Sequence, residues 1–418
     1  MKITILAAGT RGDVQPYISL GRELKKAGQE VRIATFKNFE DLVKGSGLEF
    51  YPIKGDVSSL AISDSTRSVR QADNPLKIIL GFNKLKSYVF ELQEDFFNAC
   101  TGSDAIVYHP GVTIGFFAAQ YLRIPSILAT PFPMTPTRDF PALIFYNSVR
   151  LGGRYNYATH KIFEQVMWFG SSSAVSQFWK KKFGRAPQEF SCPFGKQNTR
   201  INPTIISCSN HVFPRPRDWS ENVYNTGYWF LDEEADWKPS DGLLDFLQSG
   251  AAPVYVGFGS LGEPSQAVQT TRLVIEALRR SGRRGILATG WGGMSIIDNV
   301  PDDIFIIESA PHSWLFPRMA AVVHHGGAGT TAAGLRAGIP SIIIPQSNDH
   351  FAWGRRLYEL GVGSKPIPKK NLTGEKLADA VKFVSTKEIM EAAKDLGVKI
   401  QGEKGAETAA RIIIDCLK

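Results

Sequence analysis

The sequence predicts an α/β protein with two Rossmann-like domains that face each other across a cleft. Its length of 418 residues is too great for one ordinary domain. Short apolar runs alternate with amphipathic helical patterns, and this alternation is interrupted near the middle of the chain. Apolar strands separated by helices are typical of a parallel sheet covered on both faces. Ligands of such sheets bind beyond the carboxyl ends of the strands.

The first domain is expected at 1–225. Its opening predicts strands and helices in alternation, the strands at 3–7, 31–35, 48–53, 105–108 and 126–130 and the helices at 17–27 and 39–44. An aromatic-rich block follows, in which two helices are expected, at about 158–168 and 175–183. Most of its aromatic side chains are interpreted as core, and the remainder are expected to line an apolar slot.

A linker is expected at 226–250, where an acidic run and Pro239 follow Trp229. The second domain, at 251–400, has strands predicted at 254–256, 286–289, 304–307, 321–324 and 341–344, with helices at 268–281, 330–337 and 351–360. The last segment, 401–418, is expected to form a helix that crosses the interface between the domains.

Composition limits the class of protein. Hydrophobic residues make up 43% and charged residues 21%, which excludes a disordered chain or a coiled coil. The net charge of +8 favours anionic partners, but no nucleic-acid-binding module is recognisable and we expect no nucleic acid. Four cysteines without paired spacing favour a reduced cytosol. No uncharged run approaches the roughly 20 residues of a membrane span, so neither export nor an anchor is expected.

The turn after the first strand contains Asp13. The segment 8–16 provides only two glycines and no acidic residue ends the second strand, so a dinucleotide site is not expected here. Asp13 has two interpretations, as a capping residue of the next helix or as a general base that faces the cleft. As a base it needs a poorly hydrated site, or proton removal concerted with attack.

A second turn, at 321–331, runs from an apolar strand through glycines into a helix that begins near Thr330. Free amides and hydroxyls at a helix N-terminus predict a cradle for a diphosphate. His324 and His325 should point to opposite faces of the strand, and His325 is the one expected to face the ligand. Ser260, in a glycine turn after another strand, is expected to add a donor. No metal is expected, because no acidic residue or cysteine stands at ligand spacing near these histidines and no Asp-x-Asp occurs.

These motifs resemble the family-one glycosyltransferases. The resemblance rests on the segments 309–317, 324–331, 338–340 and 345–350. The octapeptide Gly-Thr-Arg-Gly-Asp-Val-Gln-Pro at 9–16, and Gly-Gly-Arg-Tyr-Asn-Tyr-Ala-Thr-His at 152–160, are similar to the sterol 3-beta-glucosyltransferase branch in particular. The resemblance covers nearly the whole chain. It implies the glycosyltransferase B fold, with the acceptor in the first domain and a UDP-sugar in the second.

The resemblance also implies roles for single residues. Asp13 matches the catalytic base, and the donor-binding positions match Thr10, Arg11, Ala310, His312, His325, Ala328, Gly329, Thr330 and Asp349. His350 stands where the family usually has Gln, at a position that contacts the transferred sugar, so the sugar stays open. Members invert the anomeric centre without a metal or other cofactor. The implied reaction moves a hexose, most simply glucose, to the hydroxyl of a sterol or similar hydrophobic acceptor.

Alternatives remain at this stage. The acceptor could be a polyketide, macrolide or carotenoid with a UDP- or dTDP-sugar, or the chain could be a nucleotide-binding accessory protein without catalysis; an oxidoreductase is a more distant possibility. Basic residues at 180–185 follow Phe178 and Trp179. If those rings are exposed, this segment is expected to rest on an anionic membrane. We therefore expect a cytoplasmic protein with peripheral contact to the inner face of the membrane.

Overall fold

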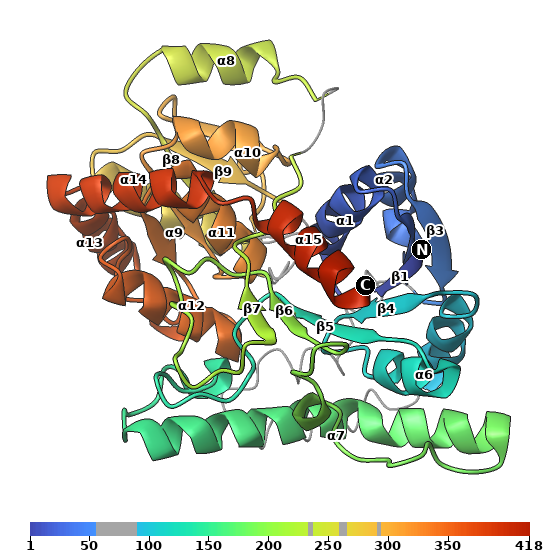
Figure 1. The fold of residues 1–418 in the computed structure, drawn as a ribbon. Helices are drawn as coiled ribbons and strands as arrows, with labels where there is room; N and C mark the ends of the chain where they lie inside the picture. The colour runs from blue at the N-terminus through green and yellow to red at the C-terminus, as the bar shows by residue number, and fades with distance from the viewer. Residues whose placement is uncertain (56–89, 233–236, 259–265, 291–293) are drawn as a thin grey trace. The chain divides into compact units, whose positions relative to one another are not determined.

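The computed structural model describes residues 1–55, 90–232, 237–258, 266–290 and 294–418. The chain divides into two compact units, one formed by 1–231 with 403–418 and the other by 232–402 (Figure 1). Each unit contains one parallel sheet with helices packed on it, as the sequence predicts. No helix in the described ranges is long and apolar enough to cross a membrane.

The sheet of the first unit has seven parallel strands in the order β3-β2-β1-β4-β5-β6-β7. The strands are β1 (Lys2–Leu6), β2 (Glu30–Phe36), β3 (Glu49–Ile53), β4 (Ala105–Tyr108), β5 (Ser126–Thr130), β6 (Thr204–Ile206) and β7 (Val223–Asn225). The five predicted strands are confirmed, whereas β6 and β7 were missed. The order of the strands reverses between β1 and β4, so the turns that follow these two strands leave a crevice between them.

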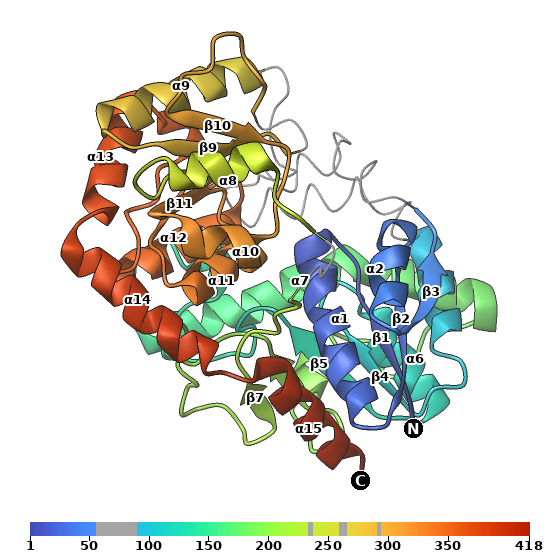
Figure 2. The same ribbon diagram turned by 90° about the horizontal axis from the view of Figure 1, so that it is seen from above.

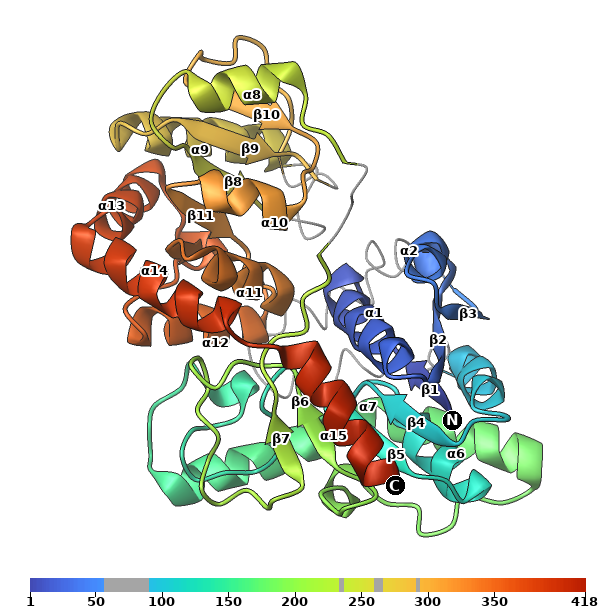
Figure 3. The ribbon, with the colours of Figure 1, turned by 45° about the horizontal axis from the view of Figure 1, so that its top comes forward.

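The helices of this unit are α1 (Arg11–Lys26), α2 (Glu40–Gly45), α6 (Ile114–Leu122), α7 (Gly153–Phe183) and α15 (Gly405–Leu417), with short 3₁₀ turns at Lys37–Phe39, Leu143–Phe145 and Phe194–Lys196. Helix α15 packs alongside α1 and adds Ala409, Ala410 and Ile413 to the core of this unit (Figure 3). The last helix therefore belongs to the first unit although it is last in the chain.

Helix α7 is one helix of 31 residues, where the sequence predicts two. The expected break falls on Gly170 and three serines, which are poor helix formers. One of them, Ser171, is buried, and its hydroxyl lies 2.7 Å from the hydroxyl of Thr113. A tertiary contact therefore overrides the weak local preference. His160 ties the helix to the preceding loop, with Nδ1 3.2 Å from the Met134 carbonyl and Nε2 3.0 Å from the Phe140 carbonyl.

The sheet of the second unit has the order β10-β9-β8-β11-β12, with all neighbours parallel. Its strands are β8 (Val254–Gly257), β9 (Gly285–Ala288), β10 (Ile304–Ile307), β11 (Ala321–His324) and β12 (Ser341–Ile343). Its helices are α8 (Asp241–Gln248), α9 (Ala267–Arg280), α10 (His312–Leu315), α11 (Ala328–Ala337), α12 (Asn348–Glu359), α13 (Gly374–Val384) and α14 (Lys387–Gln401), and 3₁₀ turns occur at Phe316–Arg318 and Lys369–Asn371. All five predicted strands are present.

Alternate residues of these strands build two separate cores. Val254 and Val256 face the core that contains α9 and α13, which pack against each other (Figure 2). Tyr255, between them, faces the core that contains α8 and α10. This period of two explains why the strands are apolar throughout: both faces of the sheet are covered. The strand order reverses between β8 and β11, which gives this sheet its own crevice.

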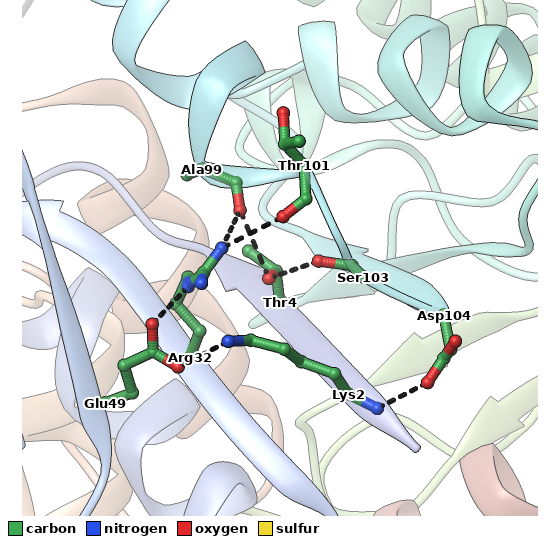
Figure 4. Close-up of polar contacts among 8 residues, drawn as sticks. All are labelled: Lys2, Thr4, Arg32, Glu49, Ala99, Thr101, Ser103 and Asp104. Carbon is green, nitrogen blue, oxygen red and sulfur yellow. Dashed lines mark hydrogen bonds and ion pairs between the residues drawn. The ribbon is translucent and has the colours of Figure 1, made fainter.

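Polar side chains close the opposite, amino-terminal edge of the first sheet (Figure 4). Arg32 donates from Nε to Glu49 at 2.7 Å and from Nη1 to the carbonyls of Ala99, at 2.8 Å, and Thr101, at 3.3 Å. Lys2 pairs with the second oxygen of Glu49 at 2.8 Å. One guanidinium therefore joins β2 and β3 to the segment that precedes β4, far along the strands from the crevice.

We expect Arg32→Met to destabilise the first unit by about 1–3 kcal/mol, because two carbonyls and a carboxylate lose a shared donor. Urea unfolding would measure the loss. Arg22→Met is the matched control, because Arg22 is exposed and no bond to it is found among the described residues. An equal loss in both variants would show that the guanidinium contributes nothing specific.

Candidate active site

Asp13 lies at the carboxyl end of β1, in the first turn of α1. The Thr10 amide donates to its Oδ2 at 2.8 Å and the Thr10 hydroxyl donates to the same oxygen at 3.0 Å. Asp13 therefore caps the helix, which explains why α1 begins at Arg11, six residues before the predicted start. No described residue donates to Oδ1. Both interpretations of Asp13 are thus compatible: one oxygen holds the turn, and the other is available to a substrate.

Gly9 makes this arrangement possible. Its φ is +137°, and a Cβ built on it would overlap the Asp13 carboxylate. Only glycine fits this position, for backbone and steric reasons together. Thr10 and Arg11, the two predicted donor-binding residues on this turn, are exposed beside Asp13.

His109, which the sequence analysis did not single out, lies across the crevice from Asp13. It follows β4, and its amide donates to the Leu6 carbonyl at the end of β1 at 3.0 Å. The Gly111 amide donates to its Nδ1 at 3.0 Å, so the neutral ring carries its proton on Nε2. Burial lowers the pKa of His109, and the negative charge of Asp13 acts in the opposite direction. A histidine directly after a buried four-residue strand was the available signal.

Tyr17 supports this side of the crevice. It lies one helical turn after Asp13, and its ring meets the His109 ring edge-on, with centroids 5.8 Å apart. Its hydroxyl donates to the Ala129 carbonyl at 2.5 Å. Burial raises the pKa of Tyr17, with a smaller contribution from the Asp13 charge. Tyr17 therefore stays a neutral donor that fixes α1 to β5.

The segment predicted to cradle a diphosphate lies at the carboxyl end of β11, where the strand order of the second sheet reverses. His324 ends the strand, Gly326 has φ +98°, and Gly327 caps α11. Helix α11 then presents Ala328, Gly329 and Thr330 in its first turn, with the exposed amide end that an anion needs. The structure thus places these three predicted residues on a single turn.

The two adjacent histidines separate as predicted. His324 is fully buried, and its Nδ1 accepts from the Gly326 amide at 3.2 Å. His325 is half-exposed and folds over the glycine turn, so that a Cβ on Gly327 would lie 2.5 Å from its Nε2. Nδ1 of His325 is buried without a hydrogen-bond partner among the described residues. Such an unpaired group at the start of a helix fits a polar ligand.

Burial keeps this cluster uncharged. It lowers the pKa of His324 to about 3 and that of His325 well below its usual range, and in both cases neighbouring histidines contribute to the lowering. A neutral imidazole still donates one N–H, so the cradle offers dipoles rather than a fixed positive charge. A bound diphosphate would supply the negative charge that favours protonation.

His350 is not exposed to solvent. It is buried, its ring centroid lies 4.9 Å from that of His325, and its Nδ1 accepts from the Gln346 amide at 3.4 Å. Asp349, next to it at the start of α12, is half-exposed, and its Oδ1 accepts from the Ser347 hydroxyl at 2.7 Å. Asp349 is therefore the more accessible of the two predicted sugar-binding residues.

The remaining predicted residues lie near the other strands of the second sheet. His312 begins α10 and stacks on Phe316, with centroids 4.2 Å apart. Ala310 is half-buried in the loop between β10 and α10. Ser260 lies outside the described residues. In the described part of the chain, no three histidine, cysteine or acidic side chains gather at a spacing that could hold a metal ion.

Comparisons with known proteins agree with this architecture. Residues 3–141 match the N-terminal domain of glycosyltransferase family 28, and residues 283–414 match the erythromycin biosynthesis protein CIII-like C-terminal domain. A solved glycotransferase of kitacinnamycin covers 100% of the chain and 99% of its own with a TM-score of 0.74 at 18% identity. SsfS6 of Streptomyces sp. SF2575, solved with thymidine diphosphate, has a TM-score of 0.64 at 18% identity, and the match covers 99% of both chains. The class is therefore a glycosyltransferase with the B fold.

Curated relatives narrow the class. A sterol 3-beta-glucosyltransferase of Arabidopsis thaliana is 34% identical, and the match covers 98% of this chain and 67% of the relative. A sterol 3-beta-glucosyltransferase of Candida albicans is 37% identical, and the match covers 98% of this chain and 27% of the relative. The chain belongs to the sterol 3-beta-glucosyltransferase family. It spans about two thirds of the length of the plant relatives and a third or less of the fungal ones. The family and fold predicted from the motifs are confirmed.

We expect Gly9→Ala to lower the glycosyl-transfer rate at least tenfold, since a strained φ costs on the order of 1–3 kcal/mol and the new methyl displaces the carboxylate. UDP affinity should fall less than the rate, because the cradle belongs to the other unit and only Thr10 and Arg11 adjoin the changed turn. Gly12→Ala is the control: its Cβ would meet nothing closer than 3.8 Å. Similar rates for the two variants would contradict the role assigned to Gly9.

In the cradle, Gly327→Ala should weaken UDP binding on the order of tenfold, equivalent to about 1.4 kcal/mol, because the methyl moves His325 while the backbone keeps an ordinary φ. Calorimetric titration with UDP gives the affinity, and the melting temperature gives the stability. Gly242→Ala, whose Cβ would lie 3.6 Å from Phe305, is the control in the same unit. Unchanged UDP affinity in Gly327→Ala would remove His325 from the binding site.

Proposed function

We propose that this chain is an inverting glycosyltransferase that moves a hexose, most simply glucose, from a UDP-sugar to the 3-hydroxyl of a sterol. The observation that carries the proposal is that each sheet has functional groups where its strand order reverses. A carboxylate with one open oxygen stands at the crevice of the first sheet, and an uncharged anion cradle stands at that of the second. The names of relatives at 34–37% identity supply the acceptor class.

The chemistry follows from these groups. Oδ1 of Asp13 takes the proton of the acceptor hydroxyl while its oxygen attacks the anomeric carbon from the face opposite the leaving group. The bond between that carbon and the phosphate oxygen breaks, its electron pair remains on UDP, and the configuration is inverted. Oδ2 keeps its two bonds to Thr10 throughout, so the base does not need to reorient. His109 lies near enough for the negative charge of Asp13 to oppose the lowering of its pKa by burial.

The leaving diphosphate would be stabilised by the first amides of α11, the Thr330 hydroxyl and His325. These donors are fixed before the reaction, so they need little reorganisation as negative charge develops. We propose on this basis that no metal ion is required, and activity in the presence of a chelator would test this. Thr10, Arg11, Ala310, His312 and Asp349 are proposed to contact the donor. His350 is proposed to support the donor site indirectly, because its ring packs against the ring of His325.

The acceptor is proposed to bind in the first unit, where the aromatic block proves to be mostly core. Tyr146, Phe163, Phe178 and Trp179 are buried, whereas Phe132, Phe145 and Trp168 are partly exposed and available to an apolar ligand. Burial of Phe178 and Trp179 removes the exposed rings expected beside the basic segment at 180–185. Lys182 instead lies over the Phe97 ring, 4.6 Å from its centroid. Peripheral contact with an anionic membrane, in a cytoplasmic protein, remains part of the proposal.

Asp13→Asn should reduce turnover by roughly 10²–10⁴-fold with UDP affinity and folding intact, because the amide keeps the cap but cannot take a proton. Product mass from incubations with UDP-glucose and a sterol measures the reaction. Full activity of the variant would contradict the assignment of the base.

The same assay separates the alternatives. A panel of polyketide, macrolide and carotenoid acceptors, each with UDP- and dTDP-sugars, would reveal a different acceptor class. Absence of both transfer and UDP-sugar hydrolysis, with UDP still bound, would favour a non-catalytic nucleotide-binding protein instead.

A further inference from the structure

Large apolar side chains are exposed along α7 and in the loop just before it. They belong to Val149, Leu151, Tyr157, Ile162 and Phe169, which are 72%, 66%, 42%, 47% and 39% exposed. Single exposed apolar residues are ordinary on a protein surface, but five within 21 residues are not scattered singly. In Figure 1 the helix, drawn in green, lies beside the sheet of the first unit, with one side turned away from that sheet.

The three helical members of this set lie on one side of α7. At about 100° per residue, Tyr157, Ile162 and Phe169 fall within an arc of roughly 140°. The core side of the helix is already complete, because Thr159, Phe163 and Val166 are buried on it. The exposed residues lie away from this core side. We name this surface, formed by Val149, Leu151 and the three helical residues, the α7 face.

The charges on the α7 face itself have one sign, and the exposed acidic residues Asp139 and Glu189 flank this part of the chain. Arg154 and Lys161 fall in the same helical arc, and Arg150 stands between Val149 and Leu151. Between Phe140 and Gln188 the sequence has seven lysines and arginines and one acidic residue, Glu164. Glu164 is buried, and its carboxylate accepts from Lys161 at 3.0 Å. No residue of this stretch therefore presents an exposed negative charge.

Exposed apolar side chains among basic ones, with no exposed acid, are typical of a surface that inserts shallowly at an anionic lipid interface. Basic residues near such a surface add electrostatic attraction to the anionic lipids, and the apolar side chains add the hydrophobic part. An acidic protein surface would also complement these charges, and absence of binding to anionic vesicles would point to such a partner instead.

We propose that the α7 face docks on an anionic bilayer, with Val149 and Leu151 inserted among the headgroups. This deepens the proposed function, on which it rests in part, because a sterol acceptor is held in a bilayer. It also moves the expected contact from the basic C-terminal end of α7, where the rings are buried, to the N-terminal end.

Sedimentation with vesicles tests the proposal without donor or acceptor. The chain should bind vesicles of phosphatidylcholine with phosphatidylglycerol, and bind phosphatidylcholine alone much more weakly. Val149→Glu/Leu151→Glu should reduce binding to the anionic vesicles at least tenfold. Ile296→Glu/Val398→Glu is the matched control, because these residues of the other unit are 77% and 62% exposed. It should bind as the unaltered chain does.

Three results would overturn the proposal: no binding of the unaltered chain to anionic vesicles, equal binding to both kinds of vesicle, or full binding by the Val149/Leu151 variant. Light scattering gives a further test. If the Val149/Leu151 variant differs from the unaltered chain in solution mass, the α7 face is a contact between copies of the chain and the proposal is overturned. Glycosyl transfer to a sterol dispersed in cyclodextrin separates the docking proposal from the proposed function. The variant should keep this activity if only docking is lost, whereas vesicle binding by the unaltered chain without any transfer would contradict the proposed function alone.

Discussion

Both units depend on one topological constraint, the reversal of strand order in a parallel sheet. Where the order reverses, the connections of two adjacent strands leave in opposite directions and their carboxyl ends are uncovered. In the first sheet these strands are β1 and β4, and in the second they are β8 and β11. Asp13 and His109 follow the first pair, and His325 follows the second. The chemistry is therefore placed by the order of the strands.

Small residues turn these uncovered ends into sites. Gly9 leaves room for a carboxylate to fold back over its own turn, and Gly327 does the same for an imidazole. At the first site the functional group itself holds the loop that carries it, and at the second site the residue before the functional imidazole does so. Asp13 caps α1, and His324 accepts from the amide of Gly326. Stability of the turn and position of the reactive group are consequently linked, and a substitution at either glycine should disturb both.

Sequence patterns predicted most of the sheet architecture because both sheets are covered on two faces and their strands are apolar runs. The patterns failed at β6 and β7, whose apolar runs are only two residues long, Ile205 with Ile206 and Val223 with Tyr224. They also failed where a tertiary bond such as that of Ser171 keeps a helix intact. The motifs located Asp13 and the cradle, because each lies directly after a strand.

The parts of the site that were missed depend on packing, which a linear pattern does not record. His109 is far from Asp13 in sequence and meets it only through the pairing of β1 with β4. The contact of the buried His350 with His325 was likewise not visible in the sequence, and the predicted contact of His350 with the sugar stays a prediction. Burial of Phe178 and Trp179 similarly could not be read from a helix whose apolar residues point to more than one side.

The return of α15 to the first unit has a consequence for biosynthesis. A ribosome completes the whole of 232–402 before it delivers Ala409, Ala410 and Ile413 to the core against α1. The second unit can therefore finish folding while the first still exposes an apolar helix face. Until translation reaches the last helix, this nascent half is the part that a chaperone would have to shield.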